Sequence, residues 1–345
     1  MLAFTALRLG RAHRETAVRT ATRVTPMQRR TLIRVAGWIA TGVVIGFVGA
    51  RLRRDLLDLR AHPLANSPRW DLVAYSGVLF LVAHAVLVQT WRSVLSCWSA
   101  RLPFWTAARI WSVSNFGKYV PGKVWQIGAM GAMSRDVGVS PLAATGSAIL
   151  GAVVNIMTGL IVVLVFGRSV LNDASGSWGA LATAATIAAC VALLLAPWLV
   201  PRLAPLASRL TKRPFEATLP ARAVVYSLTG NVAAWLVYGA AFQLFVRGML
   251  GSATGAYAAY LTAYTFSYVI GYLVLFAPAG AGFREGAMLS ALTFAGLATS
   301  PQAALVTIAS RVWLTMLEVT PGFLFWAHHR VRHRSPTTDH SDGPI

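Results

Sequence analysis

The feature that most constrains this chain is the stretch 115–136, which interrupts a sequence made almost entirely of apolar runs. A Pro-Gly pair, Pro121 and Gly122, stands at its centre, with Lys118 and Lys123 on either side. Proline removes a hydrogen-bond donor and glycine frees the backbone, so one continuous helix is disfavoured here. Broken backbone at membrane depth persists only where it is buried in protein or lines a wet cavity. The pattern therefore predicts a broken or re-entrant element whose lysines face a polar cavity.

A related pattern returns late in the chain, over residues 276–297. Proline and glycines break the apolar run and charged side chains follow at once: Pro278, Gly280, Gly282, Arg284, Glu285 and Gly286. A Ser-Pro step and a long apolar span come after each copy, at 140–141 and at 300–301. Interrupted hydrophobic segments at matching positions point to the binding site of a transporter. We therefore expect a weak internal repeat, and two independent helical corners of a bundle are the alternative.

Composition indicates an integral membrane protein. Hydrophobic residues make up 56% of the chain and charged residues 12%, whereas soluble domains carry about 25% charged residues. The 31 basic residues outnumber the 11 acidic ones, but they gather at the ends of apolar runs, where they set topology and meet anionic lipid headgroups. Nucleic acid is therefore not an expected partner. The two cysteines have no metal-binding spacing, so neither a metal nor another cofactor is expected.

The pattern predicts an all-α polytopic membrane helix bundle with three regions. Residues 1–34 hold eight arginines and one glutamate and are expected to form a basic cytoplasmic tail without a cleavable signal. Residues 35–326 are expected to form the membrane domain, and residues 327–345 a polar, disordered tail. Apolar spans are expected over 35–50, 72–91, 143–167, 178–200, 223–246, 257–277 and 302–326.

The number of crossings depends on the two broken segments near Pro121 and Pro278. About eight transmembrane helices keep the N-terminal tail, the 202–222 loop and the C-terminal tail on the cytoplasmic side, provided that the segment near Pro278 crosses completely. If both segments are re-entrant, seven crossings remain and the C-terminal tail lies outside. We favour eight crossings.

Polar residues inside the spans are the remaining site candidates. Arg311 and Glu318 lie about two helical turns apart on one face, and neither is expected to stay unpaired in lipid. Five tyrosines from Tyr257 to Tyr272 share a helical face, which either packs against a neighbour or lines a headgroup cavity. His84 is expected to hydrogen-bond between helices and not to relay protons.

Together these motifs resemble the lysylphosphatidylglycerol synthase transmembrane-region family, the flippase domain of bacterial multiple-peptide-resistance proteins. The resemblance covers roughly residues 35–326 and rests on three runs: NFGKYVPGKVWQIGAMGAMSRDVGVSP, PAGAGFREGAMLSALTFAG and ASRVWLTMLE. The motifs of the family fall on Pro121-Gly122-Lys123, Arg284-Glu285-Gly286 and Arg311. Ala279 stands where the family usually has glycine. We expect a stand-alone member, without the soluble aminoacyltransferase domain.

The resemblance implies a flippase or transporter in the bacterial cytoplasmic membrane. Its expected cargo is a lipid with a polar headgroup, either an aminoacylated phospholipid or a polyprenyl-phosphate-linked sugar. The expected substrate contacts are Lys118, Lys123, Arg284, Glu285, Arg311 and Glu318, with the cations holding phosphate and the acids balancing them or pairing with a cationic headgroup. Structural ion pairs are the alternative for these residues. The alternative function is a non-catalytic membrane partner of a glycosyltransferase or lipid-modifying enzyme. No catalytic constellation is recognisable, so the chain is not expected to be an enzyme.

Overall fold

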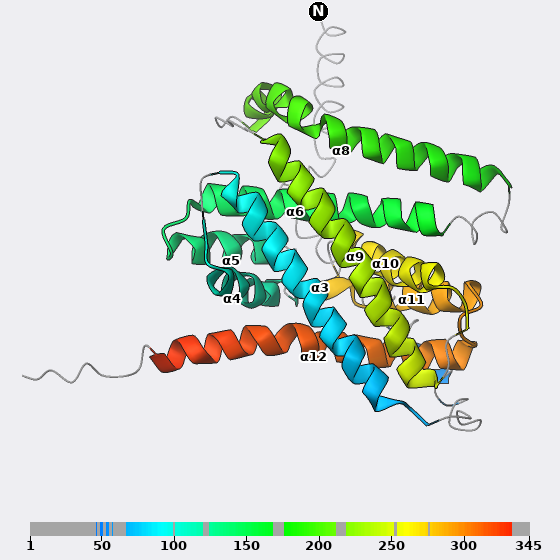
Figure 1. Ribbon diagram of the computed structural model, residues 1–345. Coiled ribbons are helices and arrows are strands. Elements are labelled where there is room, and N and C mark those ends of the chain that lie inside the picture. Colours follow the sequence, from blue (N-terminus) through cyan, green and yellow to red (C-terminus); the bar gives the residue numbers. More distant parts are fainter. Residues whose placement is uncertain are drawn as a thin grey trace, which may run out of the picture.

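The computed structural model describes residues 67–98, 101–119, 124–167, 176–211, 219–251, 254–274 and 277–332, with a few positions between 46 and 57. Every regular element in these ranges is a helix (Figure 1). Four helices are long and apolar enough to cross a membrane: α3 (Trp70–Ser96), α6 (Pro141–Phe166), α9 (Ala221–Leu250) and α12 (Ser300–Arg332). The prediction of an all-α bundle is confirmed for this part of the chain, and these four helices support a multi-pass membrane protein.

The order of elements occurs twice along the chain. After α3 come α4 (Phe104–Ser114), the 3-10 turn η1 (Asn115–Tyr119), α5 (Val124–Arg135) and α6. After α9 come α10 (Tyr257–Leu273), the 3-10 turn η2 (Pro278–Gly280), α11 (Phe283–Phe294) and α12. The helix α8 (Gly176–Thr211) stands between the two halves. Proline presets the backbone for a first helical turn, and the two Ser-Pro steps begin α6 and α12.

Each half contains a pair of short helices joined at a break. We call α4–η1–α5 hairpin 1 and α10–η2–α11 hairpin 2. In Figure 1 hairpin 1 lies at the left-hand end of the molecule and hairpin 2 at the right-hand end. The long helices α6 and α12 run between these ends, and α6 begins close to the end of α5. The two hairpins therefore enter the bundle from opposite ends.

The helices that follow the two breaks are too short to cross a membrane on their own. The helices α5 and α11 have 12 residues each, so each is about 18 Å long, whereas a bilayer core is about 30 Å thick. In hairpin 2 the helix α11 packs back on α10, and the predicted complete crossing near Pro278 stays a prediction. Of α8, the described residues give only a short apolar stretch, Thr183–Ala192. Four spans satisfy length and hydropathy in the described ranges, and the predicted number of about eight crossings for the whole chain stays a prediction.

Two of the predicted regions lie at the ends of the chain. The predicted tail 1–34 and nearly all of the span 35–50 lie outside the described residues. The last helix continues to Arg332, so it extends into the predicted C-terminal tail 327–345. Residues 333–345 lie outside the described residues.

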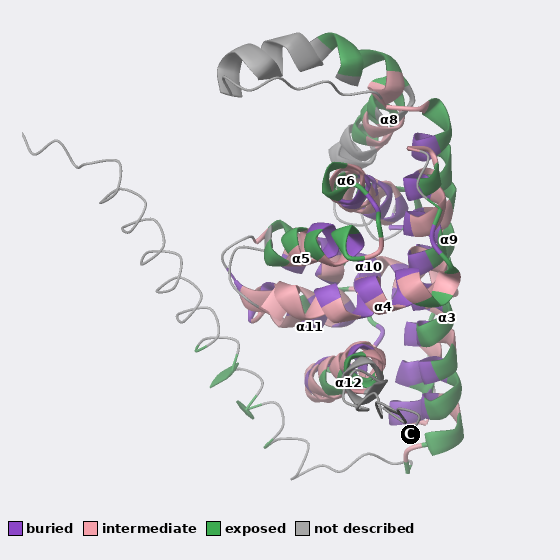
Figure 2. Ribbon diagram, turned by 90° about the vertical axis from the view of Figure 1, so that its left-hand side faces the viewer, coloured by how far each residue is buried: buried purple, intermediate pink, exposed green. Residues whose placement is uncertain are grey.

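The long helices α3 and α9 form the central contact of the bundle. Figure 2 shows them side by side along one flank, with buried residues toward the other helices and exposed residues outward. Small residues permit the close approach, because a Cβ atom at Gly230 would collide with Thr90 and one at Gly248 would lie 2.7 Å from Val73. The first helix of each hairpin packs on the last helix of the other half, α4 on α12 and α10 on α6, whereas α5 packs on α6 and α11 on α12.

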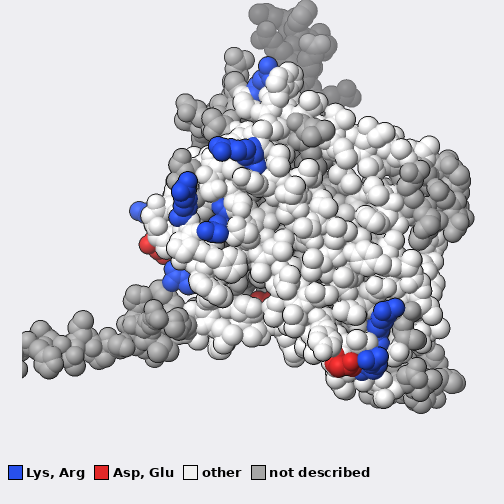
Figure 3. All heavy atoms as spheres, in the orientation of Figure 1, with Lys and Arg blue, Asp and Glu red and all other residues white. Residues whose placement is uncertain are grey.

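The surface has the charge distribution of a membrane-embedded bundle. Figure 3 shows basic side chains at two opposite ends of the visible face, with a broad uncharged surface between them. The four long helices also carry exposed apolar side chains, among them Val78, Ile149, Leu160 and Val312. Lipid tails are as apolar as these side chains, so the exposure carries no penalty in a bilayer.

Candidate functional site

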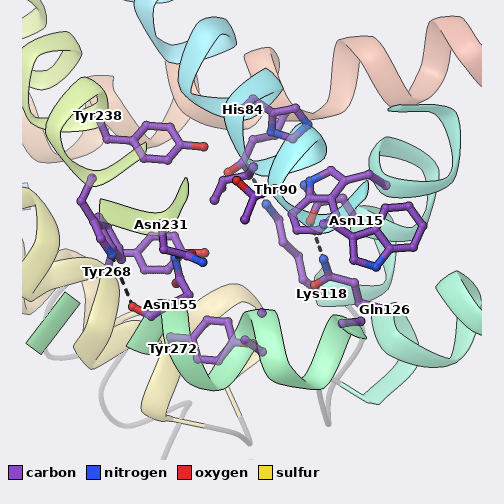
Figure 4. Close-up of a pocket in the computed structure, with 18 of the residues that line it drawn as sticks. His84, Thr90, Asn115, Lys118, Gln126, Asn155, Asn231, Tyr238, Tyr268 and Tyr272 are labelled. Carbon is purple, nitrogen blue, oxygen red and sulfur yellow. Dashed lines mark hydrogen bonds and ion pairs between the residues drawn. The ribbon is translucent and has the colours of Figure 1, made fainter. Parts of the chain in front are cut away.

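A cavity of about 150 Å³ lies where the two hairpins meet in the bundle. Residues of both halves line it, and a cavity of about this volume in another protein holds one six-membered ring. Figure 4 shows Asn115, Lys118 and Gln126 on one side, Asn155, Asn231 and Tyr268 on the other, and His84 and Thr90 between them. The charged residues in the lining are Lys118, Arg284, Arg311 and Glu318.

One ion pair ties hairpin 1 to α12. Lys118 in η1 donates a hydrogen bond through Nζ to Oε2 of Glu318, and both side chains are mostly buried. The Tyr119 hydroxyl donates to the same oxygen over 3.4 Å. The turn η1 also crosses α5 closely, because a Cβ atom at Gly117 would lie 2.5 Å from the backbone nitrogen of Gln126. Lys118 is therefore fixed by its backbone as well as by its charge partner.

A second ion pair ties hairpin 2 to the same helix. Nε of Arg311 lies 2.7 Å from Oε1 of Glu285, and Nη2 of Arg311 donates to the carbonyl oxygen of Ala279 over 2.7 Å. The other oxygen of Glu285 accepts a hydrogen bond of 2.6 Å from the backbone N–H of Gly282, which caps α11. Glu285 therefore both caps the start of α11 and neutralises the charge of Arg311.

The turn of hairpin 2 stores backbone strain. Ala279 has φ +48°, and it is the non-glycine residue with positive φ in the described ranges. Gly280 and Gly282 have φ +72° and +81°, a conformation that glycine adopts readily. A Cβ atom at Gly280 would lie 2.6 Å from backbone atoms of Gly271, so the turn presses directly on α10. The position where alanine replaces the expected glycine is thus the strained one.

Arg284 differs from the other two cations of the cavity. Arg284 is 8% exposed. Its guanidinium carbon lies 5.1 Å from the ring centre of Tyr268 and 5.7 Å from that of Tyr264. No carboxylate of the described residues comes within ion-pair distance of it. Because Lys118 and Arg311 each have a carboxylate partner, the cluster is left with one uncompensated positive charge. A buried guanidinium in this state favours an anion as its partner.

Amide side chains form two hydrogen-bonded pairs in the lining. Nε2 of Gln126 donates to Oδ1 of Asn115 over 3.0 Å, and Nδ2 of Asn155 donates to Oδ1 of Asn231 over 2.8 Å. His84 is 8% exposed, and its Nε2 atom has no hydrogen-bond partner among the described residues. A buried polar atom without a partner is costly, which favours a ligand or water that would satisfy it.

Most of the predicted site residues gather at the cavity. Lys118, Arg284, Arg311 and Glu318 line it, whereas Glu285 reaches the site through Arg311. Gly286 lies in the first turn of α11, where its N–H donates to the Gly282 carbonyl. The other predicted residues of the first break, Pro121, Gly122 and Lys123, lie outside the described residues. Pro278 and Gly280 form η2, at the turn predicted from the sequence.

Of the predicted tyrosine face, some side chains line the cavity and others pack against neighbouring segments. Tyr264, Tyr268 and Tyr272 line the cavity. In contrast, the hydroxyl groups of Tyr257 and Tyr260 donate to the backbone carbonyls of Leu236 and Thr254, which is a packing role.

The sequence interpretation missed the contribution of Asn115 and Gln126. Both belong to the stretch 115–136, and eleven positions separate them in the chain. Two amides this far apart become partners only because hairpin 1 folds back on itself. The turn at its centre was the available signal.

No protein-family model and no curated protein sequence matches this chain. The structure also offers no metal centre in the ranges it describes, since no three His, Cys, Asp or Glu side chains gather there. The functional argument therefore rests on the cavity itself.

Proposed function

We propose that this protein translocates a lipid with a polar, phosphate-bearing headgroup across a membrane. The observation that supports the proposal is a buried, net-positive polar cavity between two hairpins that enter from opposite ends. We further propose that it is a relative of the lysylphosphatidylglycerol synthase transmembrane-region flippases of the bacterial cytoplasmic membrane. The sequence motifs carry this second part.

The cavity would act by replacing water around the headgroup. A charged or hydroxyl-rich group that crosses hydrocarbon loses its hydrogen bonds, at a cost of several kcal/mol for each unsatisfied polar group. Arg284 would take the phosphate, and the amides of the lining would take the remaining polar atoms. The acyl or prenyl chain would remain in lipid outside the bundle.

The two ion pairs on α12 give the hairpins separate attachments. Breaking Lys118–Glu318 would release hairpin 1, and breaking Arg311–Glu285 would release hairpin 2. Because the hairpins enter from opposite ends, release of one at a time would open the cavity to one leaflet at a time. Inverted repeats around a central site work in this way in secondary transporters.

Headgroup translocation in liposomes tests the proposal. The purified protein is reconstituted with labelled lysyl-phosphatidylglycerol, phosphatidylglycerol or a polyprenyl-phosphate-linked sugar in one leaflet. We expect one lipid to move faster than in protein-free liposomes, and Arg284→Gln to slow it about tenfold or more. Arg69→Gln is the matched control, since Arg69 pairs with Asp71 at the exposed start of α3.

Absence of movement for every lipid, from protein that is folded by its melting profile, would overturn the proposal. The alternative is then a non-catalytic partner of a glycosyltransferase or lipid-modifying enzyme. That alternative requires a surface contact, and it does not require the uncompensated charge of Arg284 to face a cavity.

A further inference from the structure

We infer that the cavity binds a phosphate joined to a neutral, hydroxyl-rich group, such as a sugar phosphate, and not a cationic aminoacyl headgroup. The inference rests on the proposed function in one respect, namely that the ligand is part of a lipid. It separates the two headgroup classes that the sequence leaves open.

The first argument is the balance of charge in the cavity. Glu318 is the carboxylate in the described lining, and its Oε2 atom already accepts from Lys118 and Tyr119. A lysyl ammonium would have to displace Lys118 from this carboxylate while facing Arg284 and Arg311. A phosphate could pair with Arg284 without displacing another anion, because Arg284 has no carboxylate partner in the described residues.

The second argument concerns the aromatic rings of the lining. Ring faces attract ammonium groups, so tyrosines alone would be compatible with a cationic headgroup. Here the guanidinium of Arg284 already lies over Tyr264 and Tyr268. A second cation at these rings would be repelled by Arg284. The rings therefore position the cation of the protein and do not select a cation from the ligand.

The third argument is the hydrogen-bonding capacity of the remaining lining. Asn and Gln side chains present both donors and acceptors, which matches hydroxyl groups, since these also donate and accept. Within the pair Gln126–Asn115, the Gln126 oxygen and the Asn115 nitrogen are not used by the hydrogen bond between the two amides. In the pair Asn155–Asn231 the Asn231 nitrogen already donates to Ser227, so the Asn155 oxygen is the atom that these bonds leave for other partners. The buried Nε2 atom of His84 adds a further polar group without a partner in the described residues.

The size and walls of the cavity agree with one sugar ring. Its volume of about 150 Å³ is that of a site for one six-membered ring. The indole rings of Trp91 and Trp111 line the same space. The weakly positive C–H face of a sugar ring complements the negative face of an aromatic ring. Ring size, hydroxyl groups and one negative charge together describe a phosphate-linked sugar.

Binding of soluble headgroups to the purified full-length protein tests the inference independently of transport. Tryptophan fluorescence is the readout, because Trp91, Trp111 and Trp235 line the cavity. The probes are glucose 1-phosphate, methyl glucoside, inorganic phosphate and lysine methyl ester. We expect glucose 1-phosphate to bind about tenfold tighter than methyl glucoside or phosphate, and lysine methyl ester not to saturate the signal.

Variants separate a ligand role from a structural one. Arg284→Gln is expected to reduce glucose 1-phosphate to the affinity of methyl glucoside, while methyl glucoside binds as before. Gln126→Leu is expected to weaken both sugars and to leave phosphate unchanged. Arg69→Gln is the control and should change nothing. Equal loss of every probe in Arg284→Gln, or saturable binding of lysine methyl ester, would overturn the inference.

Liposomes then separate this inference from the proposed function and identify the source of the ligand. Movement of a polyprenyl-phosphate-linked sugar, and not of lysyl-phosphatidylglycerol, supports both. Movement of lysyl-phosphatidylglycerol alone would support lipid translocation and overturn the inference that the ligand is a sugar phosphate. Uptake of soluble glucose 1-phosphate without movement of any lipid keeps the ligand chemistry and overturns lipid translocation.

Discussion

The two hairpins share a backbone plan but use charges of opposite sign to reach α12. Hairpin 1 contributes a lysine, Lys118, to a glutamate of α12, whereas hairpin 2 contributes a glutamate, Glu285, to an arginine of α12. The helix α6, which occupies the corresponding place in the first half, carries no charged side chain. The repeat is therefore symmetric in its backbone and asymmetric in its chemistry. The asymmetry leaves Arg284 as the uncompensated charge at the cavity.

One of the two largest predicted effects comes from a substitution in the turn of hairpin 2. In Gly280→Ala the new Cβ atom meets the backbone of Gly271 at 2.6 Å, at a position with φ +72°. We expect a loss of about 3 kcal/mol in the free energy of unfolding, measured by denaturant titration in detergent. Gly146→Ala on α6 is the control, since no atom lies within 4 Å of its Cβ position. Equal effects of the two substitutions would contradict the close contact between η2 and α10.

The next prediction compares the two ion pairs on α12. Glu318→Gln leaves Lys118 without its carboxylate, and we expect a loss of about 3 kcal/mol. Glu285→Gln keeps an oxygen for the Gly282 N–H, and Arg311 keeps the Ala279 carbonyl, so we expect about 1–2 kcal/mol. Denaturant titrations of both variants measure the difference.

A double variant sharpens this comparison. Combining Glu318→Gln with Lys118→Met removes the unpaired charge, and we expect it to recover at least half of the stability lost in Glu318→Gln. Additive losses in the double variant would mean that Lys118 is not paired with Glu318 in the membrane.

Arg284→Gln should separate stability from function. No carboxylate of the described residues loses its partner when Arg284 is neutralised, so we expect the free energy of unfolding to change by about 1 kcal/mol or less. Translocation should fall at the same time. A loss as large as that of Glu318→Gln would assign Arg284 to a structural ion pair, and the proposed phosphate contact would fail.

The smallest predicted effect is a gain. Ala279 has a positive φ that glycine adopts without strain, so Ala279→Gly is expected to add about 0.5–1 kcal/mol to the free energy of unfolding. Ala281→Gly, two positions later at φ −53°, is the control and should lose stability. Destabilisation by Ala279→Gly would contradict the strained geometry of η2.

The sequence indicated the breaks and their charges but not the fate of each segment. Pro278, Gly280 and Gly282 predicted the turn of hairpin 2, because their backbone chemistry is local. Whether that turn lies inside the bundle depends on how η2 packs against Gly271 in α10. A local sequence pattern does not specify this contact between two separate elements. The pairing of Lys118 with Glu318 spans 200 positions, so the sequence could name both residues but not join them. The complete crossing near Pro278 stays a prediction for the same reason, since the positive-inside rule constrains loops and not the depth of a turn.

The central claim is that the two hairpins enter the membrane from opposite sides and meet at one charged cavity. Single cysteines at Asp136 and Thr299, exposed positions after α5 and before α12, test it most directly in a background without Cys97 and Cys190. A membrane-impermeant maleimide is added to sealed vesicles before and after they are opened. The account predicts that the two cysteines react from opposite sides of the membrane. Reaction of both from the same side would contradict the inverted arrangement and the route through the cavity.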